Sequence, residues 1–333
     1  MTIVRRSDVA LETPLSELLR PLTPNASFFI RNHALAVPRI PAPGYKVEVR
    51  GAHGPHVLDL ERLRALPRVS EIVTLVCAGN GRTAFVPVAG GVPWGFGAIA
   101  TARWDGVRLR DVLDLAGPHP HARHVAFEGF DEAPGPGEPP YRRSIPLERA
   151  LRDGTIVADT MNGEPLPAEH GGPLRLVVAG WTANHSMKWL RRITLTDRAD
   201  ESRWTTEDYR VPGPAGTFDV LEAPAPVAIL AAPENGAACA RDVVLHGIAY
   251  GEPAPRRVRV EIDGAHAGDA VVRYDDGPYA WGRWTFPASL APGPRRIAVR
   301  PAGPNGEPGP ARATWNAKGY RYDGPHVVDV EAV

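Results

Sequence analysis

Proline and glycine are the residues that most constrain how this chain can fold. The 333 residues include 36 prolines and 34 glycines. Proline fixes φ and lacks the backbone N–H donor, so it shortens helices and is kept out of the middle of sheets. We therefore expect many short strands, long connections and few long helices. A chain of this length is enough for about two domains.

The charge of the chain is balanced, with 38 Lys plus Arg against 38 Asp plus Glu. A neutral chain has no general attraction to nucleic acid or to an anionic membrane, so we expect neither partner. Hydrophobic residues make up 43% and charged residues 23%, which is typical of a globular protein. No stretch of about 18 apolar residues occurs, so no transmembrane helix is expected and a cytoplasmic location is predicted.

Local patterns predict strands alternating with short helices over the first 200 residues. Strands are expected at 45–49, 71–77, 124–128 and 174–179 from their alternating or β-branched residues. Short helices are expected at 16–19, 59–66, 109–115 and 146–151. Asp59 is the predicted N-cap of the second helix, and Pro146 suits the first turn of the fourth.

A change of composition follows Tyr209. Residues 211–216 form a Pro/Gly linker, and from about 225 short alternating runs recur between turns, as in 258–262 followed by Asp263-Gly264. This spacing predicts an antiparallel β-sandwich of immunoglobulin type, without the paired cysteines of antibody domains. The predicted fold class is α+β, with a mixed α/β domain at 1–220 and a β-sandwich domain at 221–333.

Two cysteines occur, Cys77 and Cys239, too few for a disulfide framework. We take Cys239 as a small buried hydrophobic residue. Cys77 ends a predicted buried strand and enters the turn Ala78-Gly-Asn-Gly-Arg82, which would present its thiol to a cavity. The positive charge of Arg82 would favour the thiolate, and soft thiolates suit soft, redox-active metals.

Other uses of Cys77 receive less support from the sequence. A nucleophilic thiol needs a neighbouring base, and no spacing places His33, His124, His170 or His185 beside it. The Cys-x-x-Cys and His-Glu-x-x-His patterns of zinc sites are absent, as is the glycine-rich phosphate loop of nucleotide-binding proteins.

Arginines and histidines suited to oxyanions are dispersed along the first domain. A guanidinium binds phosphate and other oxyanions through two parallel hydrogen bonds, and histidine can add a donor. Such residues are found at Arg31, His33, Arg82, His170 and Arg175. They form a site only if the fold brings them together.

An ordered set of segments resembles the sulfite oxidase family over nearly the whole chain. They are Phe29-Ile-Arg-Asn-His33, Cys77-Ala-Gly-Asn-Gly-Arg82, Trp94 to Trp104, Met161-Asn-Gly-Glu-Pro-Leu-Pro167, His170-Gly-Gly-Pro-Leu-Arg175, Ser186-Met-Lys-Trp-Leu190, Trp204, Asp208-Tyr209 and Trp315-Asn-Ala-Lys-Gly319. The first domain is thereby similar to that family's molybdopterin-binding domain, and the second to its dimerisation domain.

The resemblance implies a molybdenum–molybdopterin cofactor with Cys77 as the thiolate ligand of the metal. It implies that the cofactor is bound by Phe29, Ile30, Arg31, Asn32, His33, Asp131, His170, Arg175, Ser186, Met187 and Lys188. It also implies that the substrate and the reacting atoms are contacted by Arg31, Arg82, Trp94, Tyr209 and Lys318.

The function implied by the resemblance is oxidation of sulfite, or of a similar small oxyanion, to sulfate by oxo transfer. A homodimer is also implied. Because little length remains before residue 27 or after residue 320, we expect no haem domain and therefore a separate electron acceptor. Two departures from the family pattern, Gly81 and Lys318 in place of arginines, bear on the substrate. The enzymatic alternative is a molybdenum-dependent reductase of a sulfoxide or nitrate, and the non-enzymatic alternative is an adhesion or scaffold protein that would hold no metal.

Overall fold

The computed structural model describes residues 4–7, 10–33, 36–52, 54–117, 120–133, 135–213, 216–303 and 305–333. Strands dominate, and the longest α-helix in these ranges is α2, Leu109–Leu115. The other helices are α1 (Leu60–Arg64), α3 (Leu147–Ala150), α4 (Arg203–Thr206) and the 3-10 helices η1 (Leu15–Leu19), η2 (Asn25–Ser27), η3 (Arg82–Ala84), η4 (Ala168–His170) and η5 (Ala183–His185). These short elements confirm the expectation from the proline and glycine content.

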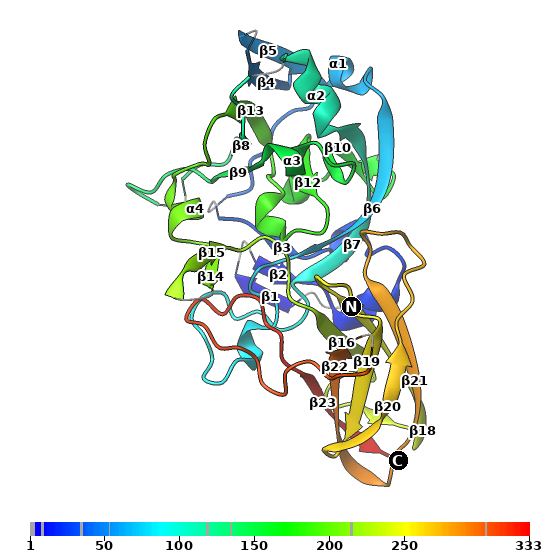
Figure 1. Ribbon diagram of the computed structural model, residues 1–333. Coiled ribbons are helices and arrows are strands. Elements are labelled where there is room, and N and C mark those ends of the chain that lie inside the picture. Colours follow the sequence, from blue (N-terminus) through cyan, green and yellow to red (C-terminus); the bar gives the residue numbers. More distant parts are fainter. Residues whose placement is uncertain are drawn as a thin grey trace.

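Two five-stranded sheets build most of the first part of the chain (Figure 1). One has the order β5-β4-β13-β8-β9, formed by β4 (Lys46–Gly51), β5 (Gly54–Asp59), β8 (His124–Gly129), β9 (Arg142–Pro146) and β13 (Leu190–Thr196). The other has the order β11-β10-β7-β6 with β12 beside β10, formed by β6 (Arg68–Val76), β7 (Ile99–Arg108), β10 (Thr155–Met161), β11 (Glu164–Pro165) and β12 (Arg175–Val178). A third, small sheet contains β1 (Val4–Ser7), β2 (Ala10–Glu12) and β3 (Ile30–Arg31).

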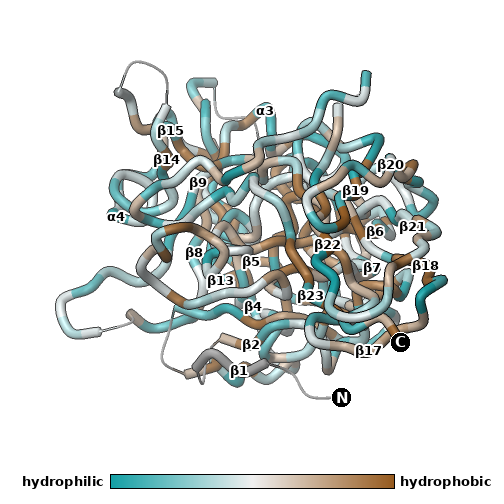
Figure 2. Tube along the Cα trace, turned by 90° about the horizontal axis from the view of Figure 1, so that it is seen from below, coloured by the Kyte–Doolittle hydropathy of each residue, from teal (hydrophilic) through white to brown (hydrophobic). Residues whose placement is uncertain are grey.

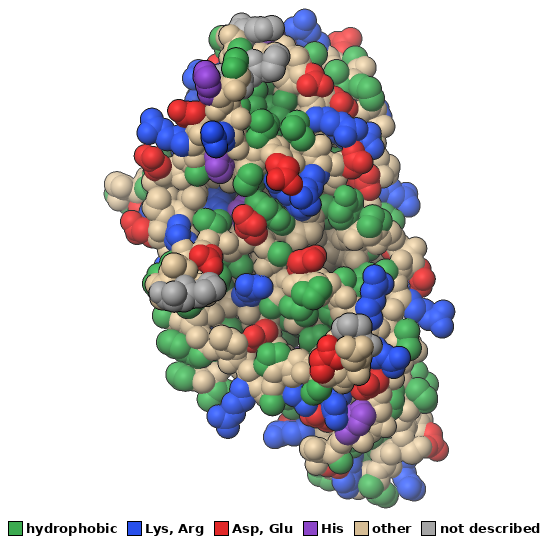
Figure 3. All heavy atoms as spheres, in the orientation of Figure 1, with side chains coloured by type: hydrophobic (Ala, Val, Ile, Leu, Met, Phe, Trp, Pro, Cys, Tyr) green, Lys and Arg blue, Asp and Glu red, His purple; other side chains and the backbone are tan. Residues whose placement is uncertain are grey.

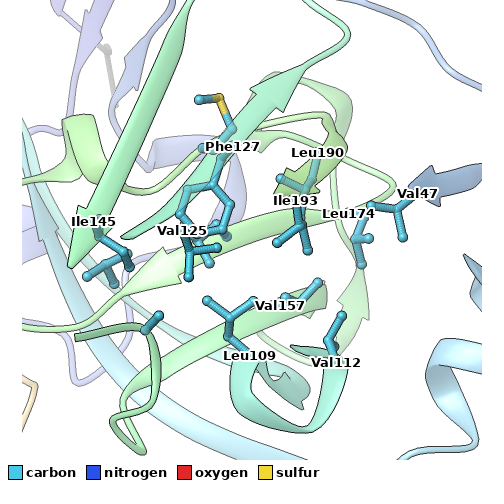
Figure 4. Packing of buried hydrophobic residues seen from close by; sticks show 14 of the residues in the cluster. Val47, Leu109, Val112, Val125, Phe127, Ile145, Val157, Leu174, Leu190 and Ile193 are labelled. Atoms are coloured by element: carbon cyan, nitrogen blue, oxygen red, sulfur yellow. The ribbon is translucent and has the colours of Figure 1, made fainter. Parts of the chain in front are cut away.

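The main hydrophobic core lies where both large sheets meet α1 and α2. Its buried side chains include Val47, Leu109, Phe127, Val157 and Ile193, which converge in Figure 4. The carboxylate of Asp59 accepts a hydrogen bond from the backbone N–H of Arg62 at 2.8 Å, which confirms the predicted N-cap of α1.

Truncating this core should destabilise the protein strongly. Phe127 is fully buried in the centre of the cluster. We expect Phe127→Ala to lower the free energy of unfolding by about 3–5 kcal/mol, because apolar burial is lost and a cavity remains. Urea denaturation of both proteins measures the difference. The control Val57→Ala, at a position 48% exposed, should change it by less than about 0.5 kcal/mol.

In the second part of the chain, from β14 (Arg210–Pro212) on, the described residues contain strands and no α-helix. After the hairpin of β14 and β15 (Phe218–Val220), one sheet has the order β16-β18-β21, with β16 (Val227–Ala232), β18 (Asp242–Tyr250) and β21 (Gly282–Ser289). The other has the order β17-β23-β22-β19-β20, with β17 (Ala238–Cys239), β19 (Arg257–Ile262), β20 (Ala265–Val271), β22 (Gly293–Ala302) and β23 (His326–Ala332).

These two sheets share one core, to which Leu230, Leu245, Val260 and Ile297 contribute. In Figure 2, hydrophobic stretches of β22 and β23 lie towards the middle of the molecule, whereas many of the loops at its edge are hydrophilic. The predicted turn after β19 is confirmed, since Asp263 and Gly264 have φ of 51° and 81°, as a two-residue hairpin turn requires. The immunoglobulin type of this sandwich stays a prediction.

The two parts of the chain share a further buried cluster. It joins Leu18, Val76 and Ile99 to Val227, Ile229, Ile248, Tyr250 and Trp281. The backbone N–H of Thr74 also donates to the carbonyl of Tyr279 at 2.9 Å. Strand β6, which leads to Cys77, is therefore anchored on the second part of the chain.

On the face drawn in Figure 3, positively and negatively charged side chains are intermixed. Positive charge forms no continuous band on that face, as expected from the neutral composition. In the described ranges, no helix combines the length and the apolar character needed to cross a membrane.

Candidate active site

Two adjoining pockets meet at Cys77. The inner pocket encloses about 70 Å³ and the outer pocket about 460 Å³. Arg31, His33, Cys77 and Tyr209 line both pockets. They come from the end of β3, from the loop after it, from the end of β6 and from the segment between α4 and β14. Residues far apart in the sequence therefore converge on one sulfur atom.

The inner pocket gathers nearly all of the residues predicted to bind a cofactor. Its lining includes Phe29, Arg31, Asn32, His33, Cys77, Asp131, His170, Arg175, Ser186, Met187, Lys188 and Tyr209. Ile30 lines neither pocket. Its backbone pairs with Leu11 in the small sheet, and successive side chains of a strand point to opposite faces, so the side chains of Ile30 and Arg31 diverge. A side-chain role for Ile30 in binding is thus not supported by its position.

The backbone of Cys77 is held by two hydrogen bonds. Its N–H donates to the carbonyl of Ala98 at 2.9 Å, and its own carbonyl accepts from the N–H of Asn80 at 3.0 Å. No cluster of three or more histidine, cysteine, aspartate or glutamate side chains suited to a metal exists among the described residues. A metal bound to Cys77 must therefore bring its remaining ligands with it, as the metal of an organic cofactor does.

Two positively charged side chains of the inner pocket, Arg175 and Lys188, form no ion pair with a carboxylate in the described part of the chain. Arg175 is 2% exposed and donates to the backbone carbonyls of His170 at 2.7 Å and Ser186 at 3.2 Å. Lys188 donates to the side-chain oxygen of Asn32 and to the carbonyl of Glu169, both at 2.7 Å. Burial lowers the pKa of Arg175 to about 9 and that of Lys188 well below its ordinary value. An isolated buried charge is costly, so an anionic ligand would stabilise this arrangement.

Several buried polar atoms of the inner pocket have no hydrogen-bond partner among the residues that the structure describes. They are Nδ2 of Asn32, Oδ1 of Asp131, Nδ1 of His170 and both amide atoms of Asn184. Buried polar atoms in native proteins are nearly always paired. The inner pocket therefore fits a ligand that carries its own donors, acceptors and negative charge.

Asp131 makes the stability of the cofactor-free protein depend on pH. Burial raises the pKa of this carboxyl to about 6, above its ordinary value of 3.8. The folded state thus binds the proton more tightly than the unfolded state, so the wild type should gain stability as the pH falls from above 6 towards 3.8. We expect Asp131→Asn, which mimics the protonated form, to be more stable than the wild type at pH 7.5.

Urea denaturation of the two cofactor-free proteins at pH 7.5 and pH 4.5 measures this effect. The stability advantage of Asp131→Asn should shrink at the lower pH, because the wild-type carboxyl is then largely protonated in the folded state. A difference that stays constant between the two pH values would show that the Asp131 carboxyl is not the titrating group.

The hydroxyl of Tyr209 is oriented by a chain of polar contacts. Nε2 of His33 lies 2.6 Å from the Tyr209 hydroxyl oxygen, and Nδ1 of His33 lies 3.2 Å from Nη2 of Arg31. Burial, followed by the charge of Arg31, lowers the pKa of His33 well below 6.5, so its ring is neutral. Arginine can only donate, which makes Nδ1 the acceptor and leaves the proton on Nε2. His33 therefore donates to Tyr209, whose hydroxyl proton remains free for a ligand.

Tyr209 adopts a backbone conformation that is rare for a residue with a side chain. Its φ is 53°, in the left-handed region, and its ring stacks on Tyr320 at a centroid distance of 5.5 Å. Such backbone strain persists where the surrounding structure holds it, often at functional sites. Here it directs the ring into the junction of the two pockets.

Arg82 is enclosed by glycines at the wall of the outer pocket. It is 6% exposed, and its Nη1 donates to the carbonyl of Val92 at 2.8 Å, whereas its Nε has no hydrogen-bond partner within the described ranges. A Cβ at Gly91 would lie 2.9 Å from Nη1 of Arg82, and one at Gly319 would lie 2.8 Å from its Cγ. Only residues without side chains leave room for this guanidinium. In the described part of the chain, no carboxylate forms an ion pair with it.

The rim of the outer pocket is an ion-pair chain. Nζ of Lys318 lies 2.9 Å from Oδ1 of Asp208, whose Oδ2 lies 3.3 Å from Nη2 of Arg203. Nη1 of Arg203 lies 2.9 Å from Oε2 of Glu138. The side chain of Lys318 is 49% exposed, so this predicted substrate contact lies at the entrance, whereas Trp94 is fully buried in the wall.

Sequence patterns missed several residues of the site. Tyr141 stacks on His33 at a centroid distance of 4.7 Å, and its hydroxyl donates to the carbonyl of Asn184 at 2.5 Å. Buried Arg143 lies 5.6 Å from the ring centroid of Tyr209, and Tyr320 lines the outer pocket. Tyr141 and Arg143 follow a Gly/Pro-rich loop, and Tyr320 follows the Trp315 segment. Proximity to these motifs was the only available signal.

Comparison with known proteins places this architecture in a family. Residues 34–204 match the oxidoreductase molybdopterin binding domain. The sulfite oxidase of Gallus gallus is 37% identical over 336 residues, covering 92% of this chain and 72% of that protein. The mitochondrial sulfite oxidase of Drosophila melanogaster is 32% identical, with 93% and 59% covered, so this chain spans about three fifths of that relative. The NADH nitrate reductase 1 of Oryza sativa subsp. japonica is 31% identical, with 92% and 38% covered.

Among solved structures, the sulfane dehydrogenase SoxCD of Paracoccus pantotrophus aligns with a TM-score of 0.82 at 26% identity, covering 98% of this chain and 85% of that one. This alignment extends over both parts of the chain, so the whole fold is similar. The matched domain, the sulfite oxidases and the architecture agree with each other and with the segments identified in the sequence. The chain therefore belongs to the sulfite oxidase family of molybdopterin-dependent oxidoreductases.

Proposed function

We propose that this enzyme oxidises sulfite to sulfate and passes two electrons to a separate acceptor. The balanced half-reaction converts sulfite and one water molecule into sulfate, two protons and two electrons. The observation that carries the proposal is the position of Cys77, which lines both a pocket suited to an anionic cofactor and a pocket with cationic walls. The names of the sulfite oxidase relatives support the same substrate.

The residues of the inner pocket fit the cofactor. Arg175 and Lys188 would compensate its phosphate charge, and the unpartnered atoms of Asn32, Asp131 and His170 would pair with its ring donors and acceptors. Cys77 would supply the single protein ligand to the metal. When bound, the cofactor supplies oxygen-atom transfer to the substrate and takes up two electrons.

The outer pocket would bind and orient the oxyanion. Arg31 and Arg82 would neutralise its charge, and the free hydroxyl proton of Tyr209 would donate a hydrogen bond to it. Neutral His33 keeps Tyr209 in this orientation, since its Nε2–H occupies a lone pair of the tyrosine oxygen. Lys318 at the rim would attract anions, although its ion pair with Asp208 reduces the charge it offers.

A second candidate is a molybdenum-dependent reductase of nitrate or a sulfoxide. The observation in its favour is the 31% identity with a plant nitrate reductase over 92% of this chain. The same cationic pocket would bind nitrate as well as sulfite. The proposal also includes a homodimer formed through residues 221–333, with residues 1–220 as the catalytic domain.

Paired assays separate the two candidates. We expect purified, molybdenum-loaded enzyme to reduce ferricyanide when sulfite is added, and to show at most weak oxidation of reduced viologen by nitrate or a sulfoxide. Metal analysis should give about one molybdenum per chain. Turnover with reduced viologen and nitrate that exceeds sulfite oxidation would reject the proposal in favour of the reductase.

A further inference from the structure

The loop that carries Cys77 is held from the second part of the chain. Nδ2 of Asn80 donates to the hydroxyl of Tyr250 at 3.0 Å, and the N–H of Arg321 donates to the carbonyl of Ala78 at 2.9 Å. Tyr250 is the last residue of β18, some 170 positions from Asn80. The loop at 77–82 therefore depends on contacts with β18 and with the segment before β23, which carry none of the residues predicted to bind the cofactor.

Asn80 connects this support to the backbone of Cys77. Its Oδ1 accepts from the N–H of Ala98 at 2.9 Å, and the carbonyl of Ala98 accepts from the N–H of Cys77 at 2.9 Å. Asn80 is 5% exposed and Tyr250 is 7% exposed, so water does not compete for their hydrogen bond. The side chain of Asn80 thus connects the turn after Cys77 to Ala98 through its oxygen and to Tyr250 through its nitrogen.

Gly81, in the same loop, also packs against the second part of the chain. It has a φ of 82°, and a Cβ there would lie 2.9 Å from Cγ of Tyr322. The ring of Tyr322 packs edge-on against Phe85 and Phe96, and its hydroxyl donates to the carbonyl of Pro325 at 2.7 Å. Any side chain at position 81 would be strained and obstructed. The glycine found here in place of an arginine is therefore matched to the ring that covers it.

We propose that Tyr250 is a positioning residue for Cys77, acting through Asn80, so that the second part of the chain sets the geometry of the thiol. This inference rests on the proposed role of Cys77 as metal ligand. In Tyr250→Phe the ring still fills its site, but the buried donor of Asn80 loses its acceptor. The turn at 77–82 then loses its connection to β18 while the residues that line both pockets remain unchanged.

The test begins with the cofactor-free protein. Iodoacetamide alkylation of native protein, followed by mass spectrometry, gives the rates at Cys77 and Cys239, and Cys239 serves as an internal reference. We expect Tyr250→Phe to raise the ratio of the two rates about tenfold, because a turn that has lost this hydrogen bond opens locally more often and exposes the thiol. The matched control is Tyr274→Phe, which loses a hydroxyl bonded to the carbonyl of Pro255 and does not contact the loop. Its ratio should equal that of the wild type.

The molybdenum-loaded enzyme gives a second measurement. Tyr250→Phe should lower kcat for sulfite about tenfold with KM changed less than twofold, and it should shift the absorption of the metal–thiolate bond. If Tyr250 acts through Asn80, the double variant Asn80→Ala/Tyr250→Phe should be no slower than Asn80→Ala alone.

An unchanged alkylation ratio in Tyr250→Phe would overturn the inference, as would a lower unfolding midpoint with normal kcat and absorption. The outcomes for the proposed function are separate. A wild-type enzyme that contains molybdenum but does not oxidise sulfite would refute the sulfite proposal, while the alkylation result in cofactor-free protein would still decide the role of Tyr250.

Discussion

Cys77→Ser should lower sulfite-dependent ferricyanide reduction at least about 100-fold, beyond the usual effect of changing a residue outside the first coordination shell. A serine hydroxyl stays protonated and presents a hard oxygen ligand, whereas soft, redox-active metals prefer a thiolate. No alternative cluster of protein ligands exists among the described residues that could take over the metal. Initial rates with sulfite and ferricyanide, normalised to molybdenum content, measure the effect.

The matched control is Cys239→Ser. Cys239 lies in β17 of the second part, half-buried against a separate core, and should tolerate the change with activity within twofold of the wild type. Circular dichroism and the unfolding midpoint establish that both variants fold. A Cys77→Ser enzyme that contains molybdenum and retains more than a tenth of wild-type activity would rule out Cys77 as the required ligand.

Arg82→Met should lower kcat/KM for sulfite about 10²–10³-fold, because one preorganised cationic group facing the substrate is removed. Most of the loss should appear as a higher KM, since a dianion must then enter a pocket with less positive charge. Arg82→Lys should be intermediate, because lysine keeps the charge but lacks the planar pair of donors. Steady-state kinetics over a wide range of sulfite concentrations separates the two parameters.

Stability distinguishes this effect from misfolding. Arg82 is buried with no carboxylate partner in the described residues, so removing its charge should leave the unfolding midpoint of the cofactor-free protein unchanged or higher. Arg62→Met, at an exposed position in α1, is the control and should have wild-type kinetics. A kcat/KM within threefold of the wild type in Arg82→Met would exclude Arg82 from substrate binding.

Local signals in the sequence predicted much of the fold correctly. Asp59 caps α1 as predicted, because an N-cap depends only on residues within one turn. The Asp263-Gly264 turn is equally local, since both residues tolerate positive φ. The buried strand that ends before Cys77 was evident from its β-branched residues. Each of these features is determined within a few neighbouring residues.

The site could be predicted only in part. The ordered motifs selected Arg31, Cys77, Arg82 and Tyr209, and the fold brings all four to one outer pocket. The neutral state of His33 and its hydrogen bond to Tyr209 could not be foreseen, because they result from burial and from a partner 176 residues away. Neither could the ion pair that Lys318 forms with Asp208, which is 110 residues away.

The sequence alone determined which residue types were available: one thiol at the end of a strand, dispersed arginines, and turns and caps defined by short-range sterics. The tertiary structure alone decided which of them meet, which lose their water, and which carry unpaired charge. Desolvation and long-range contact depend on every element packed around a site. The burial of Arg82 against Gly319 and the hydrogen bond of Tyr250 to the Cys77 loop are consequences of packing between the two parts of the chain.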